Sequence, residues 1–381
     1  MSFVTPLWTL GTYLVPFVFV LSIVVFFHEM GHFLVGRLCG IKVDAFSLGF
    51  GPEIAHFTDR YGTRWRLAAL PLGGYVRFHG DANGASEPDF AAAAAMPEAE
   101  RSVSFFAQKV WKRAAVVAAG PAANFVLALV IFTALFYFQG RQILTPRIES
   151  VVADGRAAAA GFQKNDVVLA IDGRKINGFM EMQRIVTGSG DIPLRFTILR
   201  DGKQIELEAT PQRKDLTTPF GVDRVGVLGV AAGGKPEDWR LETYSLPQAG
   251  ALAAQETWFV VARTGSYLSG LFTGRESTKQ LSGPIRIAEV SGEVAKAGIW
   301  PLFNLAAILS ISIGLLNLLP VPLLDGGHLL FYGFEALRGR ALTARAQEFG
   351  FKIGMAFVAL LMLVATYNDL LRLTRQWLNL G

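Results

Sequence analysis

The stretch His28-Glu29-Met30-Gly31-His32 combines residue types and a spacing that suit hydrolytic chemistry in this 381-residue chain. Two histidines four residues apart lie on the same face of a helix, because four residues make just over one turn. Imidazole nitrogens are good zinc ligands, and a glutamate between them can activate a water molecule without being a ligand itself. The pattern predicts a zinc site with His28 and His32 as ligands and Glu29 as general base.

The zinc motif, residues 28–32, follows a run of residues that would be soluble in lipid. No charged residue occurs in 1–27, 114–140, 297–324 or the shorter run 353–368. A helix needs about 20 apolar residues to cross a bilayer. The first three runs are long enough, and Lys352 could extend the fourth by reaching outward. We therefore expect a polytopic α-helical membrane protein with about four transmembrane helices. Ionisable residues inside such helices are functional by default, which argues against two ordinary core or interfacial histidines.

Loop charges predict how the chain is oriented. Lys and Arg follow the first apolar run, precede the second and follow the third, in segments 37–113 and 338–352, and none occurs before the first run. The positive-inside rule places both segments in the cytoplasm, and the N-terminus and segment 141–296 outside. Segment 141–296 also carries Lys and Arg, but it is long enough to be translocated whatever its charge. The net charge of +5 is then mainly a topology signal, and we expect no nucleic-acid partner. The single cysteine excludes an internal disulfide.

A catalytic zinc site needs a third protein ligand, and the segment NLLPVPLLDGGH, residues 317–328, offers a candidate. Its two prolines break the helix, which allows an acidic side chain to turn inward. Asp325 lies where the third apolar run ends, on the same side of the membrane as the zinc motif, so the two could meet. His328 is a rival ligand, and His56 and His79 suit the site less well.

Three further segments differ in character from the apolar runs. Residues 43–80 are rich in glycine and aromatic residues and alternate polar with apolar residues, which predicts strands beside the membrane. Residues 141–215 contain short β-rich runs separated by Asp-Gly turns, which predicts a compact α+β module. Residues 216–296 read as a connector with an amphipathic helix near 247–274.

These motifs resemble those of the site-2 protease family of intramembrane zinc metalloproteases, and most closely the bacterial regulator-of-sigma-E protease group. HEMGH and NLLPVPLLDGG carry the resemblance, which extends through SLGFGP, ALPLGGYVRF, RAAVVAAGPAANF and LSGPIRIAEV. The stretch AAAAGFQKNDVVLAIDGRKI resembles a PDZ domain of the circularly permuted bacterial type. Members of this group often carry two such domains in tandem, whereas one is recognisable here.

The resemblance implies that zinc is bound by His28, His32 and Asp325, with Glu29 as general base. It implies that Asn317 holds the substrate strand or the developing oxyanion. Segment 43–80 resembles the membrane-entering β-hairpin of the family, whose edge could take up an unwound substrate as an extra strand. The substrate-binding residues expected there are Gly49, Phe50, Gly51, Gly73 and Gly74. Another family motif, Gly120-Pro121 with Asn124, is expected to serve helix packing and a kink.

The fold expected from all this is a helical membrane core with a membrane-associated β-hairpin sheet and an inserted α+β PDZ-like domain. The expected divisions are 1–140 for the N-terminal membrane core, 141–215 for the PDZ-like domain, 216–296 for the connector and 297–381 for the C-terminal membrane core. The expected location is the bacterial inner membrane, with the PDZ-like domain periplasmic and the active site near the cytoplasmic side.

The function expected is that of a zinc-dependent intramembrane endopeptidase. Its substrates would be single-pass membrane proteins, such as an anti-sigma factor or remnant signal peptides, cut within or near the transmembrane segment. Expected partners are such a substrate, membrane lipid, and a peptide or protein C-terminus at the PDZ-like domain. Two alternatives are a membrane zinc transporter, which would need polar residues along a path, and a catalytically silent scaffold, which would have no need of the intact motif.

Overall fold

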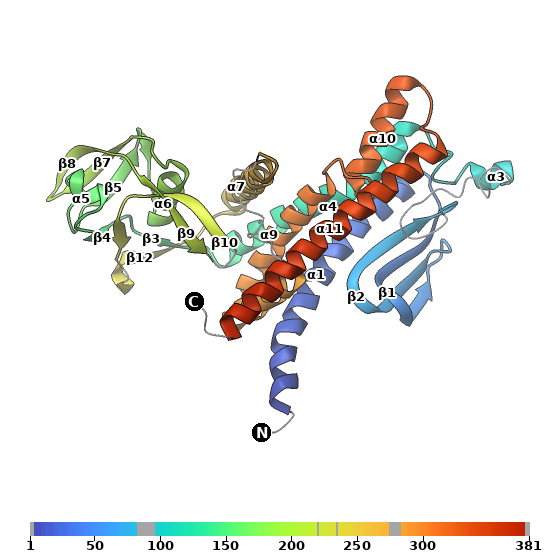
Figure 1. Cartoon of the computed structure of the whole chain (residues 1–381), viewed down its shortest axis with the longest axis horizontal. Coiled ribbons are helices and arrows are strands. Elements are labelled where there is room, and N and C mark those ends of the chain that lie inside the picture. The colour runs from blue at the N-terminus through green and yellow to red at the C-terminus, as the bar shows by residue number, and fades with distance from the viewer. Residues whose placement is uncertain (1–3, 82–95, 219–220, 234, 274–282, 378–381) are drawn as a thin grey trace. The chain divides into compact units, whose positions relative to one another are not determined.

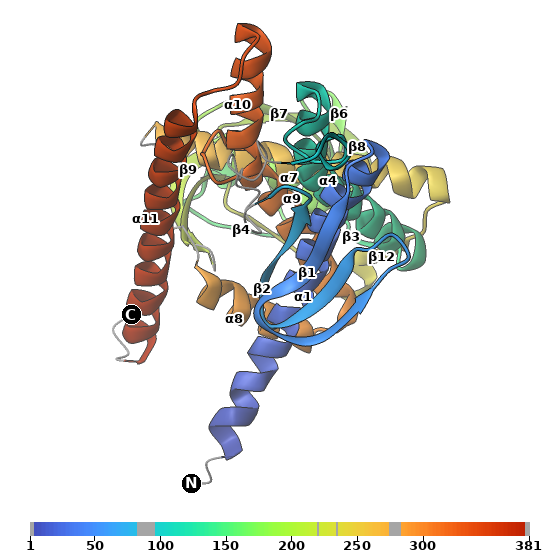
Figure 2. The same cartoon turned by 90° about the vertical axis from the view of Figure 1, so that its right-hand side faces the viewer.

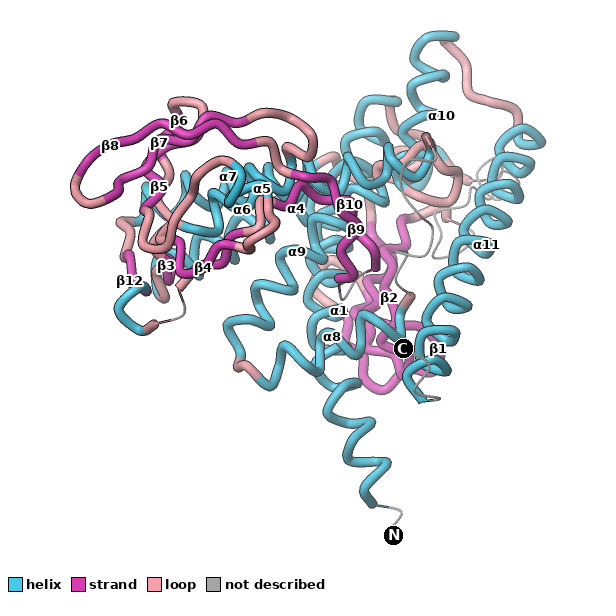
Figure 3. The backbone as a smooth tube through the Cα atoms, turned by 60° about the vertical axis from the view of Figure 1, so that its left-hand side comes forward, coloured by secondary structure: helices cyan, strands magenta, loops and turns pink. Residues whose placement is uncertain are grey.

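The computed structural model describes residues 4–81, 96–218, 221–233, 235–273 and 283–377 of the chain. It contains two compact units. One is built from Met1–Leu135, Pro247–Thr278 and Ser282–Gly381, and the other is centred on Phe136–Leu246. The first unit holds the apolar helices and the zinc motif, and the second holds most of the strands (Figures 1 and 3).

Four helices of the described residues are long and apolar enough to cross a membrane. They are α1 (Val4–Leu38), α4 (Val110–Phe138), α9 (Ile299–Asn317) and α11 (Ala344–Trp377). Figure 1 shows all four in the first unit. The four apolar runs expected to cross the membrane therefore form helices of sufficient length and hydropathy to do so. The fourth is longer than its uncharged core of residues 353–368, because its apolar segment extends over Arg345–Thr374.

The third apolar run is broken where its prolines predict a break. Helix α9 ends at Asn317, and α10 (Asp325–Arg338) begins at Asp325 after an irregular turn. In that turn Leu323 has a positive φ of 98°, a conformation that costs energy for a residue with a side chain. A Cβ atom at Gly326 would overlap the carbonyl oxygens of Leu318 and Leu319. The Asp-Gly-Gly sequence thus lets α10 start pressed against the end of α9.

The strands expected within residues 43–80 form a long, curved hairpin of β1 (Val43–Thr58) and β2 (Arg64–Phe78). Leu48 of β1 pairs with Gly74 on one side and with Leu67 on the other, so the first half of β1 lies between the two halves of β2. The hairpin curves along α1 (Figure 2). Phe33 of α1 packs against Phe46 and Trp65 of the hairpin, with ring centroids 5.7 and 5.0 Å away.

Asp59, in the turn between β1 and β2, ties the hairpin to α1. Its carboxylate accepts hydrogen bonds from Arg37 at the end of α1 (2.6 Å), from the backbone of Thr63 (3.0 Å) and from Trp65 (3.2 Å). Partial burial acts to raise the pKa of Asp59, but these hydrogen bonds outweigh it and lower the pKa to about 2. The carboxylate therefore stays charged and bonded throughout the physiological range.

Three further helices complete the first unit: α3 (Glu98–Arg101), α7 (Leu246–Phe272) and α8 (Pro284–Lys296). Helix α8 lies against α1 and α9 (Figure 3). The buried carboxylate of Asp369, on α11, accepts hydrogen bonds from the backbone amides of Gly283 (3.2 Å) and Arg286 (3.0 Å). Helix α11 thus caps the start of α8 and joins it to the helical bundle.

The second unit is an α+β module. Its central sheet has the order β6-β5-β7-β8, and three further pairs are β3 with β12, β4 with β11, and β9 with β10. The helices are α5 (Arg156–Ala159) and α6 (Phe179–Gly188). The strands are β3 (Arg141–Leu144), β4 (Ile148–Val151), β5 (Val167–Ile171), β6 (Arg174–Lys175), β7 (Leu194–Arg200), β8 (Lys203–Ala209), β9 (Gln212–Thr218), β10 (Gly221–Val227), β11 (Val230–Ala232) and β12 (Trp239–Glu242), with a 3-10 turn at Pro236–Asp238.

The second unit extends beyond the boundary expected at residue 215. Strands β11 and β12 return to pair with β4 and β3, near the start of the unit. Leu228, just before β11, is buried in the same core as Val168 and Phe196 of the central sheet. The segment 216–246, expected to be a connector, therefore completes this unit, because the pairing partners of β11 and β12 lie about 80 to 100 residues earlier in the chain.

Replacing Asp59 with Ala should loosen the hairpin at neutral pH. The change leaves Trp65 Nε1 without its acceptor and Arg37 with Thr63 Oγ1 as its remaining one, and an unmet buried donor costs about 1–3 kcal/mol. Hydrogen exchange followed by mass spectrometry should show faster exchange in β1 and β2 and unchanged exchange in the second unit. Glu348→Ala, which removes an exposed ion pair with Lys352, is the matched control. Equal protection of the hairpin in Asp59→Ala and the unaltered chain would contradict this role.

The pH dependence follows from the same carboxylate. Because the folded pKa is about 2, below the usual aspartate value of 3.8, its stabilising effect is complete above about pH 4 and is lost as the pH falls through about 2. The difference between the unaltered chain and Asp59→Ala in hairpin protection, corrected for intrinsic exchange rates, should therefore shrink only in that acidic window.

Candidate metal centre

The structure brings three of the predicted ligands together. His28 and His32 lie one turn apart on α1, and Asp325 is the first residue of α10. The Nε2 atoms of the two histidines are 3.2 Å apart. His28 Nε2 lies 3.2 Å from Asp325 Oδ2, and His32 Nε2 lies 3.6 Å from Asp325 Oδ1. All three side chains are largely buried. Within the described residues this is the one group of three or more His, Cys, Asp or Glu side chains that could hold a metal ion.

The spacing fits a tetrahedral zinc ion. Zinc binds imidazole nitrogen and carboxylate oxygen at about 2.0–2.2 Å, so two ligand atoms of a tetrahedron lie roughly 3.3–3.5 Å apart. The two Nε2 atoms, 3.2 Å apart, lie close to the length of one such edge, and each has one oxygen of the Asp325 carboxylate at 3.2 or 3.6 Å. Oδ2 of Asp325 is buried and has no hydrogen-bond partner besides its contact with His28. Three protein ligands would leave the fourth position for water or substrate.

The close approach of α4 shapes the space beside the two imidazoles. A Cβ atom at Gly120 would overlap His32 Nε2 and would lie 2.9 Å from His28 Cε1. Only glycine leaves room there for the rings in this orientation. On the outer side, His32 Nδ1 lies 2.8 Å from the carbonyl oxygen of Val116, which can accept its proton. This contact fixes the tautomer of His32 so that Nε2 carries the lone pair that a metal requires.

Glu29 lies between this cluster and the hairpin. Its carboxylate interacts electrostatically with His32 and Asp325, and the backbone of Val76 in β2 hydrogen-bonds to it. A Cβ atom at Gly74 would lie 3.1 Å from Glu29 Cγ and 2.8 Å from the Ser47 carbonyl oxygen. The glycine therefore allows β2 to pass directly beside the predicted base.

The other predicted substrate-binding residues lie within the hairpin. Gly49 and Gly51 have positive φ values of 92° and 85° where β1 curves. Phe50, between them, is 45% exposed, and a Cβ atom at Gly73 would meet its ring at 2.5 Å. Of the five expected residues, Gly74 is the one that these contacts place against a residue of the zinc motif.

Asn317, the last residue of α9, reaches the same site. Its Nδ2 lies 3.4 Å from His28 Nε2. The Asn317 amide therefore lies at the edge of the metal cluster, where it could donate a hydrogen bond to a group bound there.

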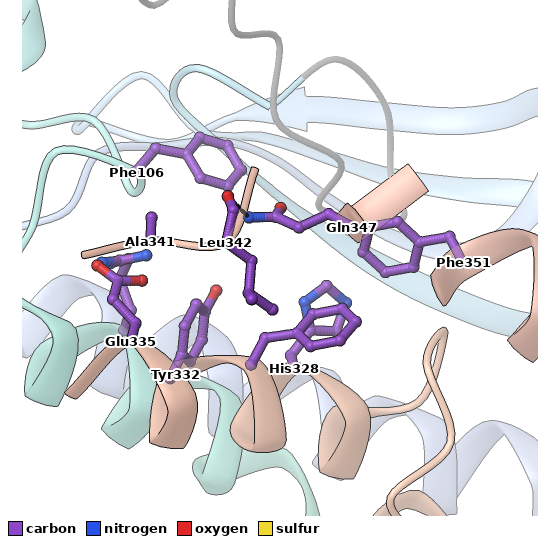
Figure 4. Close-up of a pocket in the computed structure, with 10 residues that line it drawn as sticks. Phe106, His328, Tyr332, Glu335, Ala341, Leu342, Gln347 and Phe351 are labelled. Atoms are coloured by element: carbon purple, nitrogen blue, oxygen red, sulfur yellow. Dashed lines mark hydrogen bonds and ion pairs between the residues drawn. The ribbon is translucent and has the colours of Figure 1, made fainter. Parts of the chain in front are cut away.

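The rival histidines are placed elsewhere. His328 lines a cavity of about 140 Å³ and contacts Phe351 of α11, with ring centroids 5.3 Å apart. Figure 4 shows its ring rising from α10 into this cavity beside Tyr332. His56 lies 3.3 Å from Glu53, and His79 lies 3.1 Å from Asp44, both within the hairpin region.

The same cavity contains a buried ion pair that joins α4 to α10. Arg113 donates to Glu335 at 2.6 Å, and its guanidinium lies 4.8 Å from the centre of the Tyr332 ring. Burial raises the pKa of Tyr332, so its hydroxyl stays protonated. The pair holds the helix that begins with Asp325 against the helix that carries Gly120.

The profile of Peptidase family M50 matches residues 16–361, which cover most of the chain and all of the metal cluster. The chain belongs to this family. It is 48% identical over 359 residues to the protein named "Putative zinc metalloprotease Atu1380" from Agrobacterium fabrum, covering 94% of this chain and 95% of that one. It is 47% identical over 360 residues to "Putative zinc metalloprotease R01501" from Rhizobium meliloti, covering 94% and 96%. It is 39% identical over 384 residues to "Metalloprotease MmpA" from Caulobacter vibrioides, covering 94% and 95%.

The family membership and the geometry agree. The protein is a zinc metallopeptidase of the M50, or site-2 protease, family, and it is a membrane protein with four apolar helices. Zinc is its cofactor, and the cluster of His28, His32 and Asp325 is a site that fits zinc.

Two residues at the centre, Gly120 and Asn124, belong to the motif expected to serve helix packing and a kink. Gly120 abuts both imidazoles, and Asn124 Nδ2 lies 3.2 Å from His28 Nδ1. Their spacing of four residues places them on one face of α4, which was a signal in the sequence. Nothing in the sequence alone indicates that this face points at the zinc motif.

Replacing Gly120 with Ala should abolish zinc binding. Alanine favours a helix by about 1 kcal/mol over glycine, so the helix itself should tolerate the change. The new methyl group, however, would displace the His32 ring from its position. Zinc content per chain, measured by mass spectrometry of the purified protein, should fall far below that of the unaltered chain.

Gly333→Ala, on α10, is the matched control because no atom lies within 4 Å of its added Cβ. Full zinc content in Gly120→Ala would show that the two imidazoles do not meet at the metal as described.

Proposed function

We propose that this metallopeptidase is an intramembrane endopeptidase that hydrolyses a peptide bond within or near the transmembrane segment of a single-pass membrane protein. The observation that carries the proposal is the location of the metal cluster. Its two histidines lie in α1, whose apolar segment Gly11–Leu38 is long enough to cross a membrane. Its carboxylate lies on α10, one short turn after the apolar helix α9. A site built on such helices is reached by a substrate in the same bilayer.

In this proposal His28, His32 and Asp325 hold the metal and Glu29 is the general base. Zinc bound there would act as a Lewis acid, which would polarise the scissile carbonyl and lower the pKa of water at the site. Glu29 takes the proton from the attacking water and delivers it to the nitrogen of the leaving amine. The Asn317 amide donates a hydrogen bond to the oxygen on which negative charge develops.

The hairpin is proposed to present the substrate. A transmembrane helix satisfies its amides internally, so it must unwind before a peptide bond can enter the site. An unwound segment regains hydrogen bonds by pairing with a strand edge. The contact of Gly74 with Glu29 supports a substrate path along β2 beside the base. The residues proposed to border this path are Gly49, Phe50, Gly51, Gly73 and Gly74.

The proposed location is the bacterial inner membrane. Lys and Arg border the apolar helices in 37–113 and 338–352, and the long segment 141–296 can be translocated whatever its charge, so the active site would lie toward the cytoplasmic face and the second unit in the periplasm. Membrane lipid would surround the apolar helices. Substrate classes that suit this arrangement are anti-sigma factors and remnant signal peptides.

The second unit is proposed to be a PDZ-like module of the circularly permuted type. In support, the strand β11 follows Gly229, whose φ is 86°, and pairs with β4 near the start of the unit. Among the described residues β4 is its one strand neighbour, so its other edge can accept an extended peptide. The partner would be a peptide or protein C-terminus, and the module would favour substrates already shortened by another protease.

The two alternative functions fit the described residues less well. A transporter would need metal-binding groups at successive depths, and one such group is present in the described part of the chain. A silent scaffold gives no reason for a base held beside three ligands.

Replacing Glu29 with Gln should abolish proteolysis and leave zinc bound. Glutamine keeps the shape of the side chain but cannot accept the water proton. Cleavage of a tagged single-span substrate in liposomes should fall at least about 100-fold, while zinc content stays at the level of the unaltered chain. Glu348→Gln, at an exposed position of α11, should cut normally. Retained cleavage by Glu29→Gln would remove Glu29 from the mechanism.

The filtering role of the second unit predicts a dependence on substrate size. Two substrates with the same transmembrane segment, one with a short periplasmic stub and one with a folded periplasmic domain, should be cut at different rates. The stub should be cut faster by the intact chain. Equal rates would refute the filter and leave the metal chemistry untouched.

A further inference from the structure

Asn124 occupies an isolated polar position in α4. It is completely buried among apolar helices. Its backbone carbonyl accepts a hydrogen bond from Ser310 Oγ of α9 at 2.9 Å. Its side chain reaches His28, with Nδ2 3.2 Å from His28 Nδ1. The carboxamide therefore touches the outer nitrogen of a predicted zinc ligand, on the side of the ring away from Asp325.

The position of the ring proton on His28 decides which atom of the Asn124 carboxamide must face the ring. If Nε2 of His28 binds zinc through its lone pair, the ring proton sits on Nδ1, and Nδ1 needs an acceptor. The amide nitrogen of Asn124 is a donor and cannot serve. Its oxygen Oδ1 is buried and has no hydrogen-bond partner. Rotation of the carboxamide by 180° exchanges Oδ1 and Nδ2, which are nearly the same size, and brings the unpartnered oxygen to the Nδ1 proton of His28.

A regular pattern on α4 supports this arrangement. Val116 offers its carbonyl oxygen to Nδ1 of His32 at 2.8 Å. Gly120 makes room for both imidazoles. Asn124 completes the series at the next turn, because residues spaced by four lie on one face of a helix. One face of α4 thus supplies the outer partner of each histidine and the space between them.

We propose that Asn124 is a positioning residue of the zinc site. Its Oδ1 accepts the Nδ1 proton of His28, which holds that ring in the tautomer and orientation that present Nε2 to the metal. The packing near Asn124 is consistent with a fixed side chain, since a Cβ atom at Gly314 of α9 would lie 3.3 Å from Asn124 Cβ. Such partners of metal-bound histidines typically account for about 10–100-fold in metal affinity.

The test compares two replacements of similar size in the full chain. Asn124→Leu removes the acceptor, whereas Asn124→Asp keeps an acceptor oxygen in either protonation state. The dissociation constant for zinc alone is measured by competition with a chromophoric chelator in detergent. We expect Asn124→Leu to weaken zinc binding about 10–100-fold and Asn124→Asp to stay close to the unaltered chain. The visible spectrum of bound Co²⁺ should change in Asn124→Leu and be retained in Asn124→Asp.

Ser310→Ala is the control for a purely structural effect, because it removes the hydrogen bond to the backbone of Asn124 and leaves the side chain in place. It should bind zinc normally. The inference is overturned if Asn124→Leu binds zinc as tightly as the unaltered chain, if Asn124→Asp loses as much affinity, or if Ser310→Ala loses as much.

The inference rests on the assignment of zinc to His28, His32 and Asp325. An unaltered chain that holds no zinc would overturn that assignment together with the role of Asn124. Zinc binding that is insensitive to Asn124 would overturn only the latter.

Discussion

Polar atoms buried among apolar helices need partners, and this requirement governs the arrangement around the zinc motif. Water is scarce there, so each ring nitrogen and each carboxylate oxygen must be met by a metal, a side chain or a backbone group. His28 and His32 lie on α1, and their partners come from α4, from the last residue of α9 and from the first residue of α10. The metal cluster therefore holds together segments that are far apart in the sequence.

Close contact between backbones brings these segments together around the metal cluster. In lipid, helices associate through small residues that let their backbones approach. A Cβ atom at Gly31 would overlap the carbonyl of Ala119, which brings α1 against α4 at the level of the zinc motif. A Cβ atom at Gly354 would overlap the carbonyl of Pro322, which brings α11 against the turn before Asp325. Glycine at these points converts four apolar helices into a site with defined geometry, and the same logic places Gly74 of the hairpin beside the base.

The site was predictable where its signal is local. The spacing of His28 and His32 is a property of one helix. The prolines before Asp325 predict the helix break that places this residue at a helix start. The roles of Gly120 and Asn124 depend on which face of α4 turns toward α1, and no local pattern reports that. The same limit applies to the second unit, whose final strands β11 and β12 look like a connector until their partners, β4 and β3, are known. The double pairing of β1 with both halves of β2 also arises from tertiary folding around α1.

The most direct measurement is X-ray absorption at the zinc edge on the purified chain in detergent, compared with Asp325→Ala. The account predicts two imidazole ligands with carboxylate or water oxygen at about 2.0–2.2 Å, four ligands in total and no sulfur. The variant should lose the carboxylate contribution and keep both imidazoles where zinc is still bound. A zinc–sulfur distance of about 2.3 Å, which would implicate Cys39, or a spectrum unchanged by Asp325→Ala, would contradict the assigned centre.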